Sequence, residues 1–472
     1  MKGMENGMNI IVIVADTFRW DHLSGICPKP QIETHSIEKF SEECVIFDDH
    51  YSGSIPTLPN RTDCFTGKFY LAEGGGWGPL RSDVPTLAGA MSAAGYRTQL
   101  ITSTPHILTK NNYYQRGFQF YEWIRGSEED LGLCPGNAVR PKQIQPDEKS
   151  RHTYYLPGWH LGALTEWMHG RYQWEEDMIA PTLARAASKW LEWNYKDGPF
   201  FLWIDCFDPH EPWCCPEYLR RHFDPDYDGI PMTHPSYGPA SVFTKRELFN
   251  LQANYKAQAT FADKWVGHIL RKIHDLDLMD DTLIAFTSDH GIYLGEHDRT
   301  GKDNHYNGDK RHWPVYNAVS HIPLMFRHPK AKGSRHVKGF TQPIDLTKTL
   351  IEAAGAGHSQ DMQGISLLPQ IQGKAPRGPR QYAVTGRSIE NPAINMGGWL
   401  YHPLGEGRKP ALYRLKSDPM CERNVLAANK AQAGKMRRAI VRFYRDHGAT
   451  EQAIKCFEEG KPYKKDLGLT VS

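Results

Sequence analysis

The sequence carries little excess charge and no long apolar run. Lys and Arg together number 56 against 54 for Asp and Glu, which gives a net charge of +2. A chain this close to neutral offers no broad basic surface, so we expect neither nucleic acid nor a membrane as a partner. The apolar run Asn9–Ala15 is far shorter than the ~20 residues of a membrane-spanning helix, and no small-residue cleavage site follows it.

Paired cysteines are also missing. The nine cysteines are scattered and contain no Cys-x-x-Cys pair. An odd, dispersed set indicates free thiols rather than a disulfide framework or a cysteine zinc site. Together with the absent secretory signal, this favours a cytoplasmic protein.

Several β-branched or aromatic runs are typical of strands buried on both faces of a parallel sheet. The clearest are Asn9–Ala15, Pro199–Asp205 and Asp281–Thr287, with shorter ones at 45–47, 98–101 and 321–327. Amphipathic helical patterns alternate with them, at 86–94, 180–192, 251–273 and 342–354. This alternation over residues 9–370 predicts an α/β fold with a doubly wound, mostly parallel sheet and helices on both faces.

The stretch Thr57–Gly67 places a hydroxyl at the start of a short predicted helix. Pro59 fixes the backbone there, Arg61 lies one turn on, and Thr66-Gly67 ends the segment. A helix N-terminus exposes free N–H groups and a partial positive charge, which suit an anion. Arg61 would add a permanently charged planar donor.

This pattern resembles the signature of the sulfatase branch of the alkaline phosphatase superfamily. There a Cys or Ser is followed by Pro, Arg and Thr-Gly at the spacing that Pro59, Arg61 and Thr66-Gly67 keep from Thr57. Such sulfatases convert the Cys or Ser to formylglycine. Thr57 cannot be converted, so we expect no formylglycine. A Thr nucleophile is what the phosphodiesterase and nucleotide pyrophosphatase members of the superfamily use.

The C-terminal part supports the same resemblance. Leu412–Pro419 with Asn424 resembles the family's tail motif, Leu-Tyr-x-Leu-x-x-Asp-Pro…Asn. The resemblance implies a catalytic domain over 1–372, with an irregular active-site insertion at 107–175, and a small α+β domain over 381–472 with an antiparallel sheet. The Pro/Gly/Arg-rich stretch at 373–381 is the predicted linker.

The resemblance implies one divalent metal held by Asp16, Asp289, His290 and the Thr57 side chain. Both carboxylates follow predicted strands, at the edge where open α/β sheets bind ligands. Such a mixed oxygen and nitrogen set suits Mn²⁺, Ca²⁺ or Zn²⁺. Asp16 could merely cap its strand, but its occurrence together with Asp289-His290 favours a metal. Thr17 stands where the family often has a second ligand, so its role is open.

Three further residues match positions that bind the ester in the family. His210 corresponds to a histidine that contacts an ester oxygen and can protonate the leaving group, and Lys302 to a lysine that grips the sulfuryl or phosphoryl group. His106 matches a Lys-x-His site at the His alone, since Thr104 replaces the Lys. The structural alternative is a satisfied loop histidine or a solvated lysine. The Asp-x-x-x-His set of two-metal members is not found, so the sequence favours one metal.

These residues predict a hydrolase in which Thr57 attacks a small anionic ester in line, through a covalent intermediate. The ester is a sulfate, phosphodiester or phosphonate. One alternative is a phosphoryl or phosphoethanolamine transferase, and another is a non-catalytic relative that has lost the formylglycine residue. The sequence leaves open whether the chain forms a homo-oligomer.

Overall fold

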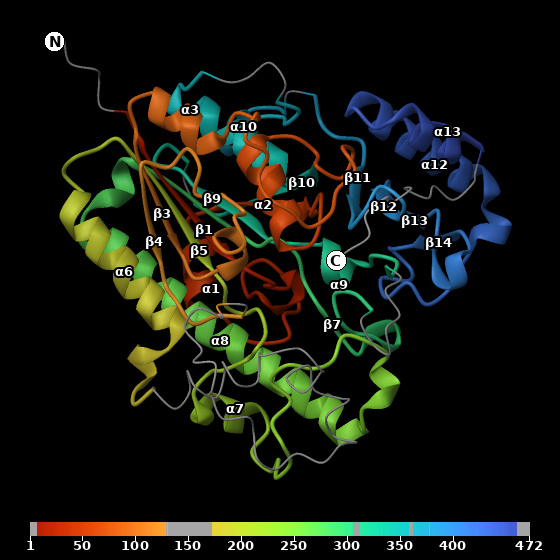
Figure 1. Ribbon diagram of the computed structural model, residues 1–472, viewed down its shortest axis with the longest axis horizontal. Coiled ribbons are helices and arrows are strands. Elements are labelled where there is room, and N and C mark those ends of the chain that lie inside the picture. The colour runs from red at the N-terminus through yellow and green to blue at the C-terminus, as the bar shows by residue number, and fades with distance from the viewer. Residues whose placement is uncertain are drawn as a thin grey trace.

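The predicted buried strands form the centre of an eight-stranded sheet (Figure 1). The computed structural model describes residues 7–128, 130, 172–304, 312–331, 333–357, 362–376 and 378–459. In spatial order the strands are β10 (Arg335–Thr341), β2 (Val45–His50), β9 (Leu324–Arg327), β6 (Thr282–Thr287), β1 (Asn9–Ala15), β5 (Phe200–Cys206), β3 (Arg97–Thr102) and β4 (Phe120–Trp123).

Most neighbouring strands run parallel, as the β-branched runs predict. β1 pairs in parallel with β6 on one side and β5 on the other. β9 is the exception, because it runs antiparallel to both β2 and β6. The carboxyl ends of β1, β5 and β6 therefore meet at one edge of the sheet.

Alternate side chains of β1 enter two different cores, which is why the whole strand is apolar. Ile11 and Ile13 belong to a core with residues of α1 (His35–Ser41), α6 (Ile179–Asn194) and α8 (Lys245–Asp275). Ile10 and Val12 belong to the opposite core, formed with α2 (Thr57–Thr66), α3 (Leu87–Ala93) and α10 (Pro343–Ala354). Helices thus cover both faces (Figure 1), and the predicted fold class is observed.

A second, antiparallel sheet follows in the C-terminal part of the chain. Its four strands lie in sequence order: β11 (Ala383–Gly386), β12 (Pro392–Met396), β13 (Trp399–His402) and β14 (Ala411–Arg414). Two helices, α12 (Lys430–Asp446) and α13 (Glu451–Glu459), cover it. Their core also includes Phe69 and Ile344 from the larger part. The domain boundaries at 372 and 381 stay a prediction.

The small sheet holds the loop that leads into Thr57. The Gly386 N–H donates to the Gly53 carbonyl at 3.0 Å, and the Ile55 N–H donates to the Gly386 carbonyl at 3.0 Å. The Thr385 hydroxyl donates to the Ser52 carbonyl at 2.5 Å. β11 thus extends its backbone pairing to the loop before α2, so the C-terminal part of the chain helps to position Thr57.

Several elements differ from the sequence prediction. α8 begins six residues before the expected position 251, because Thr244 caps it: its hydroxyl accepts from the Glu247 N–H at 3.2 Å. Of the predicted insertion 107–175, residues 129 and 131–171 lie outside the described residues, and the described part contributes β4. The remaining short elements are α7 (Glu217–Phe223), α9 (Asn317–Ser320), α11 (Leu368–Ile371), β7 (Tyr293–Leu294) and β8 (Thr300–Gly301). Within the described ranges, no helix is both long and apolar enough to cross a membrane.

Candidate active site

Thr57 is the first residue of α2, at its N-terminus as the sequence predicts. The loop before it is fixed by Asp63, one and a half turns into the helix. The Asp63 carboxylate accepts from the Ser54 N–H at 2.7 Å, from the Ser54 hydroxyl at 2.7 Å and from the Tyr70 N–H at 2.8 Å. This buried carboxylate therefore sets the path by which the backbone enters the helix, and with it the place of the Thr57 hydroxyl.

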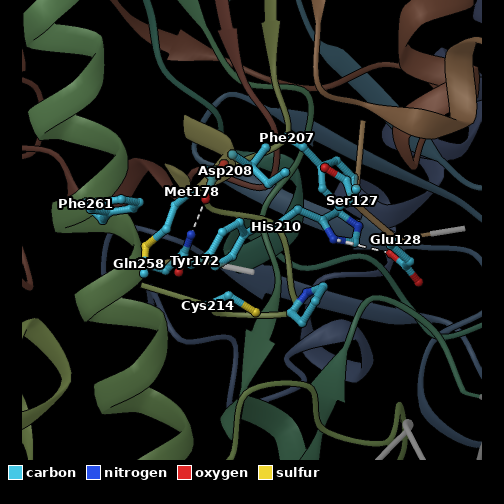
Figure 2. A pocket seen from close by; sticks show the side chains of 13 residues that line it. Ser127, Glu128, Tyr172, Met178, Phe207, Asp208, His210, Cys214, Gln258 and Phe261 are labelled. Atoms are coloured by element: carbon cyan, nitrogen blue, oxygen red, sulfur yellow. Dashed lines mark hydrogen bonds and ion pairs between the residues drawn. The ribbon is translucent and has the colours of Figure 1, made fainter. Parts of the chain in front are cut away.

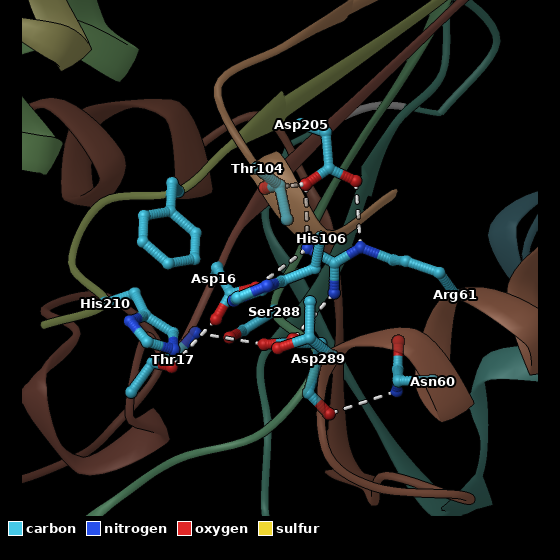
Figure 3. A network of polar contacts seen from close by, with 12 residues as sticks. Asp16, Thr17, Asn60, Arg61, Thr104, His106, Asp205, His210, Ser288 and Asp289 are labelled. Carbon is cyan, nitrogen blue, oxygen red and sulfur yellow. Dashed lines mark hydrogen bonds and ion pairs between the residues drawn. The ribbon is translucent and has the colours of Figure 1, made fainter. Parts of the chain in front are cut away.

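Asp16 and Asp289-His290 follow the neighbouring strands β1 and β6. The side chains of Asp16 and Asp289 lie close together beside Arg61 (Figure 3). Atoms of Asp16, Asp289 and His290 that could bind a metal lie within 4.8 Å of one another, and all three residues are buried. The His290 Nδ1–H donates to the Gly291 carbonyl at 3.0 Å, so the Nε2 of the neutral ring carries a lone pair. That Nε2 lies 3.4 Å from the Thr57 Oγ1. The structure thus brings together all four residues of the predicted metal set.

Arg61 joins this group from one turn into α2, with its side chain fully buried. Its Nε and Nη2 donate to the two carboxylate oxygens of Asp205, each at 2.8 Å. It also forms ion pairs with Asp16 at 3.2 Å and with Asp289 at 2.7 Å. The guanidinium is therefore held by three carboxylates (Figure 3).

The charges of this group fit a divalent cation. Burial and the negative charge of Asp289 raise the pKa of Asp16, while Arg61 acts in the opposite direction. Burial alone would raise the pKa of Asp289 too, but His290 and Arg61 hold it below its usual range. The carboxylates of Asp16, Asp205 and Asp289 against one guanidinium leave two unbalanced negative charges in a buried place. A divalent cation would balance them.

Thr17 orients both carboxylates of the proposed metal set. Its N–H donates to the Asp289 Oδ1 at 2.9 Å, and its hydroxyl donates to the Asp16 Oδ1 at 2.8 Å. Its φ of 63° lies in the left-handed region, which is rare for a β-branched residue. The Tyr255 hydroxyl helps to hold this backbone by donating to the Thr17 carbonyl at 2.9 Å. In this arrangement Thr17 acts on the metal set as a hydrogen-bond donor.

His210 lies on the loop after β5, where its ring stacks on Phe207 with centroids 4.1 Å apart. Its Nδ1–H donates to the Glu211 carbonyl at 2.5 Å. Burial lowers the pKa of His210 to about 3, so the ring is neutral near pH 7 and carries a lone pair on Nε2. As a neutral ring, His210 accepts at Nε2, and it gains a proton to donate only after an anionic ligand raises its pKa.

Lys302 is buried, and its ammonium forms an ion pair with Glu211 at 3.0 Å. Glu211 is itself fully buried and lies 3.6 Å from the His210 Nδ1. The ammonium charge is one of the causes that lower the pKa of His290, after burial. Lys302 therefore lies close enough to act on both the His210 loop and the Asp16–Asp289–His290 group.

A family model described as Sulfatase matches residues 8–356. The chain belongs to the sulfatase family. The Multifunctional alkaline phosphatase superfamily protein PehA of Trinickia caryophylli is 24% identical over 440 residues, covering 76% of each chain. The Choline-sulfatase of Rhizobium meliloti (strain 1021) is 23% identical over 485 residues, covering 95% of this chain and 88% of its own.

The fold is also found in solved relatives. The phosphonate monoester hydrolase of Agrobacterium radiobacter has a TM-score of 0.71 at 23% identity, covering 93% of this chain and 96% of its own. The predicted family and fold class are thus confirmed. As a member of the sulfatase family, the chain is a hydrolase that acts on ester bonds.

Two parts of this sulfatase-family site were not predicted from the sequence. One is Asp205: it ends the predicted strand Pro199–Asp205, which pairs with β1, so the rule that ligands bind beyond the carboxyl ends of parallel strands indicates it as well. Glu128 was not singled out at all. Its Oε2 lies 3.8 Å from the His106 Nε2 and 3.6 Å from the His210 Nδ1, and its Oε1 lies 3.8 Å from the His234 Nε2. No local pattern in the sequence marks Glu128 or His234.

A pocket opens beside this second group, on the side of α8 (Figure 2). Its volume is about 520 Å³ including the open mouth, and His210 and Glu128 form part of its wall. Most of the rest is apolar or aromatic, with a polar pair in which the Gln258 amide donates to Asp208. Burial raises the pKa of Asp208 to about 6.

Proposed function

We propose that this chain is a metal-dependent hydrolase in which Thr57 attacks a sulfate, phosphodiester or phosphonate ester. The observation that carries the proposal is the position of the Thr57 hydroxyl: at the N-terminus of α2 and 3.4 Å from the His290 Nε2. In the first step the Thr57 oxygen bonds to sulfur or phosphorus, the bond from that atom to the leaving oxygen breaks, and the leaving oxygen gains a proton in place of the one that Thr57 loses, so that it departs as an alcohol. In the second, water attacks the same atom and releases Thr57.

Asp16, Asp289, His290 and Thr57 would hold one divalent cation, with Mn²⁺, Ca²⁺ and Zn²⁺ as the candidates. When bound, such a cation supplies positive charge at the reacting centre. Asp205 holds the Arg61 guanidinium in place by two hydrogen bonds of 2.8 Å, so that the permanent charge stays beside the nucleophile.

Three residues are proposed to contact the ester. Lys302, already placed by its ion pair of 3.0 Å with Glu211, would bind a non-bridging oxygen. His210 would accept a hydrogen bond while neutral, and would help the leaving group once the bound anion has raised its pKa. His106, whose ring centroid lies 6.3 Å from that of His210, completes the set.

The identity of the nucleophile affects which ester the enzyme should prefer, because it decides how the covalent intermediate is resolved. Formylglycine sulfatases release sulfate from a geminal diol, an exit that a Thr ester lacks. A Thr adduct must instead be hydrolysed by water, which gives phosphodiester or phosphonate chemistry more weight. The fold shared with a phosphonate monoester hydrolase is compatible with this preference.

The test is a metal-supplemented panel of an aryl sulfate, an aryl phosphate monoester, an aryl phosphodiester and an aryl phosphonate. Thr57→Ala is expected to lower kcat by at least about 1,000-fold, because it removes the attacking atom. Thr62→Ala is the matched control, since it removes a hydroxyl from the same helix that instead donates to the Leu58 carbonyl at 2.9 Å.

Each result of the panel has a distinct meaning. Diester or phosphonate turnover that Thr57→Ala abolishes supports the proposal. Preferred sulfate turnover that the same change abolishes would mean that Thr replaces formylglycine without its chemical exit. No turnover of any ester with metal bound would favour the non-catalytic alternative. Transfer of the group to an added alcohol in place of water would favour a transferase.

A further inference from the structure

The pocket beside His210 has a polar corner in a wall that is otherwise mostly apolar (Figure 2). Gln258 on α8 and Asp208 on the loop after β5 form this corner, where the Gln258 amide donates to the Asp208 Oδ1. Both residues are at most 7% exposed. The corner therefore combines a carboxylate and an amide that water hardly reaches.

The Gln258 amide turns an acceptor toward no donor. An ionised carboxylate cannot donate, so the amide Nε2 faces Asp208 and the Oε1 points elsewhere. Within the part of the chain that the structure describes, this Oε1 is buried and accepts no hydrogen bond. A buried acceptor without a donor destabilises a protein. The atom therefore indicates a ligand that brings an N–H or O–H group into the pocket.

Asp208 lacks a positive partner. Its second oxygen, Oδ2, lies 4.0 Å from the thiol of Cys206, which is a weak donor. Over the described ranges of the chain, Asp208 forms no ion pair with a Lys, Arg or His, and burial raises its pKa to about 6. Near pH 7 most of the carboxylate is still ionised, so a cation bound beside it would stabilise the charged form.

The rest of the pocket suits the carbon atoms of an organic cation. Phe261 lies three residues after Gln258 on the same face of α8, and Tyr172, Met178 and Ile179 also line the pocket. Aromatic faces attract cations, and apolar walls bind the alkyl or aryl part of a ligand. A bare metal ion would gain nothing from these walls. The pocket thus fits an organic amine better than an inorganic cation.

We propose that this pocket binds an ammonium group with at least one N–H, carried by the leaving alcohol of the ester. Asp208 would pair with the charge, and the Gln258 Oε1 would accept from the N–H. The inference rests on the proposed function, because His210, which would help the leaving group, lines the same pocket. It narrows the substrate to the ester of an amino alcohol or of an aminoalkyl phenol. A quaternary ammonium group would match the charge of Asp208 but leave the Gln258 acceptor without a donor.

The test compares aryl esters that differ only in the para substituent: aminomethyl, ethyl or trimethylammoniomethyl. The aminomethyl and ethyl groups are similar in size, so their kcat/KM ratio measures the preference for the charge. Asp208→Asn should lower this preference at least about 10-fold, the effect of one charged hydrogen bond. Glu176→Gln is the control and should leave the preference unchanged, because it removes an exposed carboxylate two residues before Met178. Comparing two proteins on the same pair of esters cancels the intrinsic reactivity of the leaving groups.

Binding of the product alcohol, 4-(aminomethyl)phenol, gives a readout that does not depend on turnover. Titration calorimetry should show binding at least about 10-fold weaker to Asp208→Asn than to wild type or Glu176→Gln. Unchanged preference and unchanged product binding in Asp208→Asn would overturn the ammonium site. If product binding depends on Asp208 but no ester is turned over, the ammonium site stands and the proposed function fails.

The trimethylammoniomethyl ester tests the N–H. A wild-type enzyme that prefers this ester to the aminomethyl ester would overturn the part of the proposal that assigns an N–H to the ligand. If Asp208→Asn does not fold, as judged by circular dichroism, Gln258→Met replaces it, since Met keeps the length of the side chain. This change should lower the preference for the aminomethyl over the trimethylammoniomethyl ester at least about 3-fold, and an unchanged preference would contradict the role of Gln258.

Discussion

Replacing Arg61 by Met would test how the buried charges of the site are balanced. The guanidinium is fully buried and forms ion pairs with Asp16, Asp205 and Asp289 at 3.2, 2.8 and 2.7 Å. Removing one partner of a buried ion pair costs about 3–5 kcal/mol, because the remaining charge stays buried and uncompensated. Because three carboxylates are left behind, we expect Arg61→Met to lower the free energy of unfolding by an amount at the upper end of this range, about 5 kcal/mol, when a chelator keeps metal away.

Saturating Mn²⁺ should reduce this loss without abolishing it. A cation held by Asp16 and Asp289 replaces the missing charge beside two of the three carboxylates, and its binding stabilises the folded state by linkage. Asp205 lies outside the predicted metal set, so it keeps its hydrogen bonds from Thr104 and Trp203 but is left without its Arg61 partner. The double variant Arg61→Met/Asp205→Asn should therefore recover at least about 1 kcal/mol relative to the sum of the single changes.

The assay is denaturant unfolding followed by tryptophan fluorescence, with EDTA and with Mn²⁺. Arg380→Met is the control: Arg380 forms a two-bond pair with Asp345 at 2.7 and 2.5 Å, partly buried and away from the site. The decrease in the free energy of unfolding that Arg380→Met causes should be the same with and without metal. If Arg61→Met unfolded within about 1 kcal/mol of wild type in EDTA, the carboxylates would not be charged as argued, and the charge balance that implies a cation would fail.

Two further predictions concern residues around the site. Asp63→Asn should cost about 2–3 kcal/mol and lower kcat, because only one of the two oxygens remains an acceptor and the new NH₂ group must face the N–H of either Ser54 or Tyr70; denaturation and the ester panel measure both effects. A second prediction concerns His50, whose pKa burial lowers to about 3. Between pH 3 and about 6.5 the unfolded chain therefore binds more protons at this residue than the folded chain does. The free energy of unfolding then falls as the pH falls. From pH 6.5 to 5.0, His50 should lower the free energy of unfolding by about 2 kcal/mol. His50→Gln should remove this contribution to the pH dependence of the free energy of unfolding. An unchanged pH dependence would contradict the lowered pKa of His50.

The core of the sheet could be predicted because each central strand is apolar along its whole length. A buried parallel strand such as β1 can be recognised from its own apolar run, without knowing which strands it pairs with. The edge strand β10 was missed because most of its side chains are at least partly exposed, so it shows no apolar pattern. The antiparallel direction of β9 could not be predicted either, since direction depends on how the connections run and leaves no mark in a short apolar run.

The residues of the site likewise divide into those that a sequence pattern marks and those that only the tertiary structure brings together. Asp16 and Asp289-His290 were found because residues that follow parallel strands meet at one edge of the sheet. Thr57 was found because its motif is local. Glu128 and His234 come from loops whose approach depends on tertiary packing, and neither lies in a pattern of its own. The sequence therefore predicted the residues of the proposed metal site, and the group around Glu128 became visible only in three dimensions.

Charge alone does not select among the esters proposed for this site. An aryl sulfate, a phosphodiester and a phosphonate monoester each carry one negative charge, so each balances the same net charge of the protein and its cations. A phosphate monoester carries up to two, and it should be the poorest match to a site whose acidic residues already outnumber its basic ones. On the proposed mechanism, we expect selection among the first three to come from the second step, the attack of water on the Thr57 adduct. Glu211 links two residues that are proposed to contact the ester: its backbone carbonyl accepts from the His210 Nδ1–H, and its carboxylate forms an ion pair with Lys302 at 3.0 Å. On the proposed mechanism, we expect the residues that position water opposite Thr57 to decide the substrate, and the arrangement around Glu211 to matter to specificity as much as the nucleophile itself.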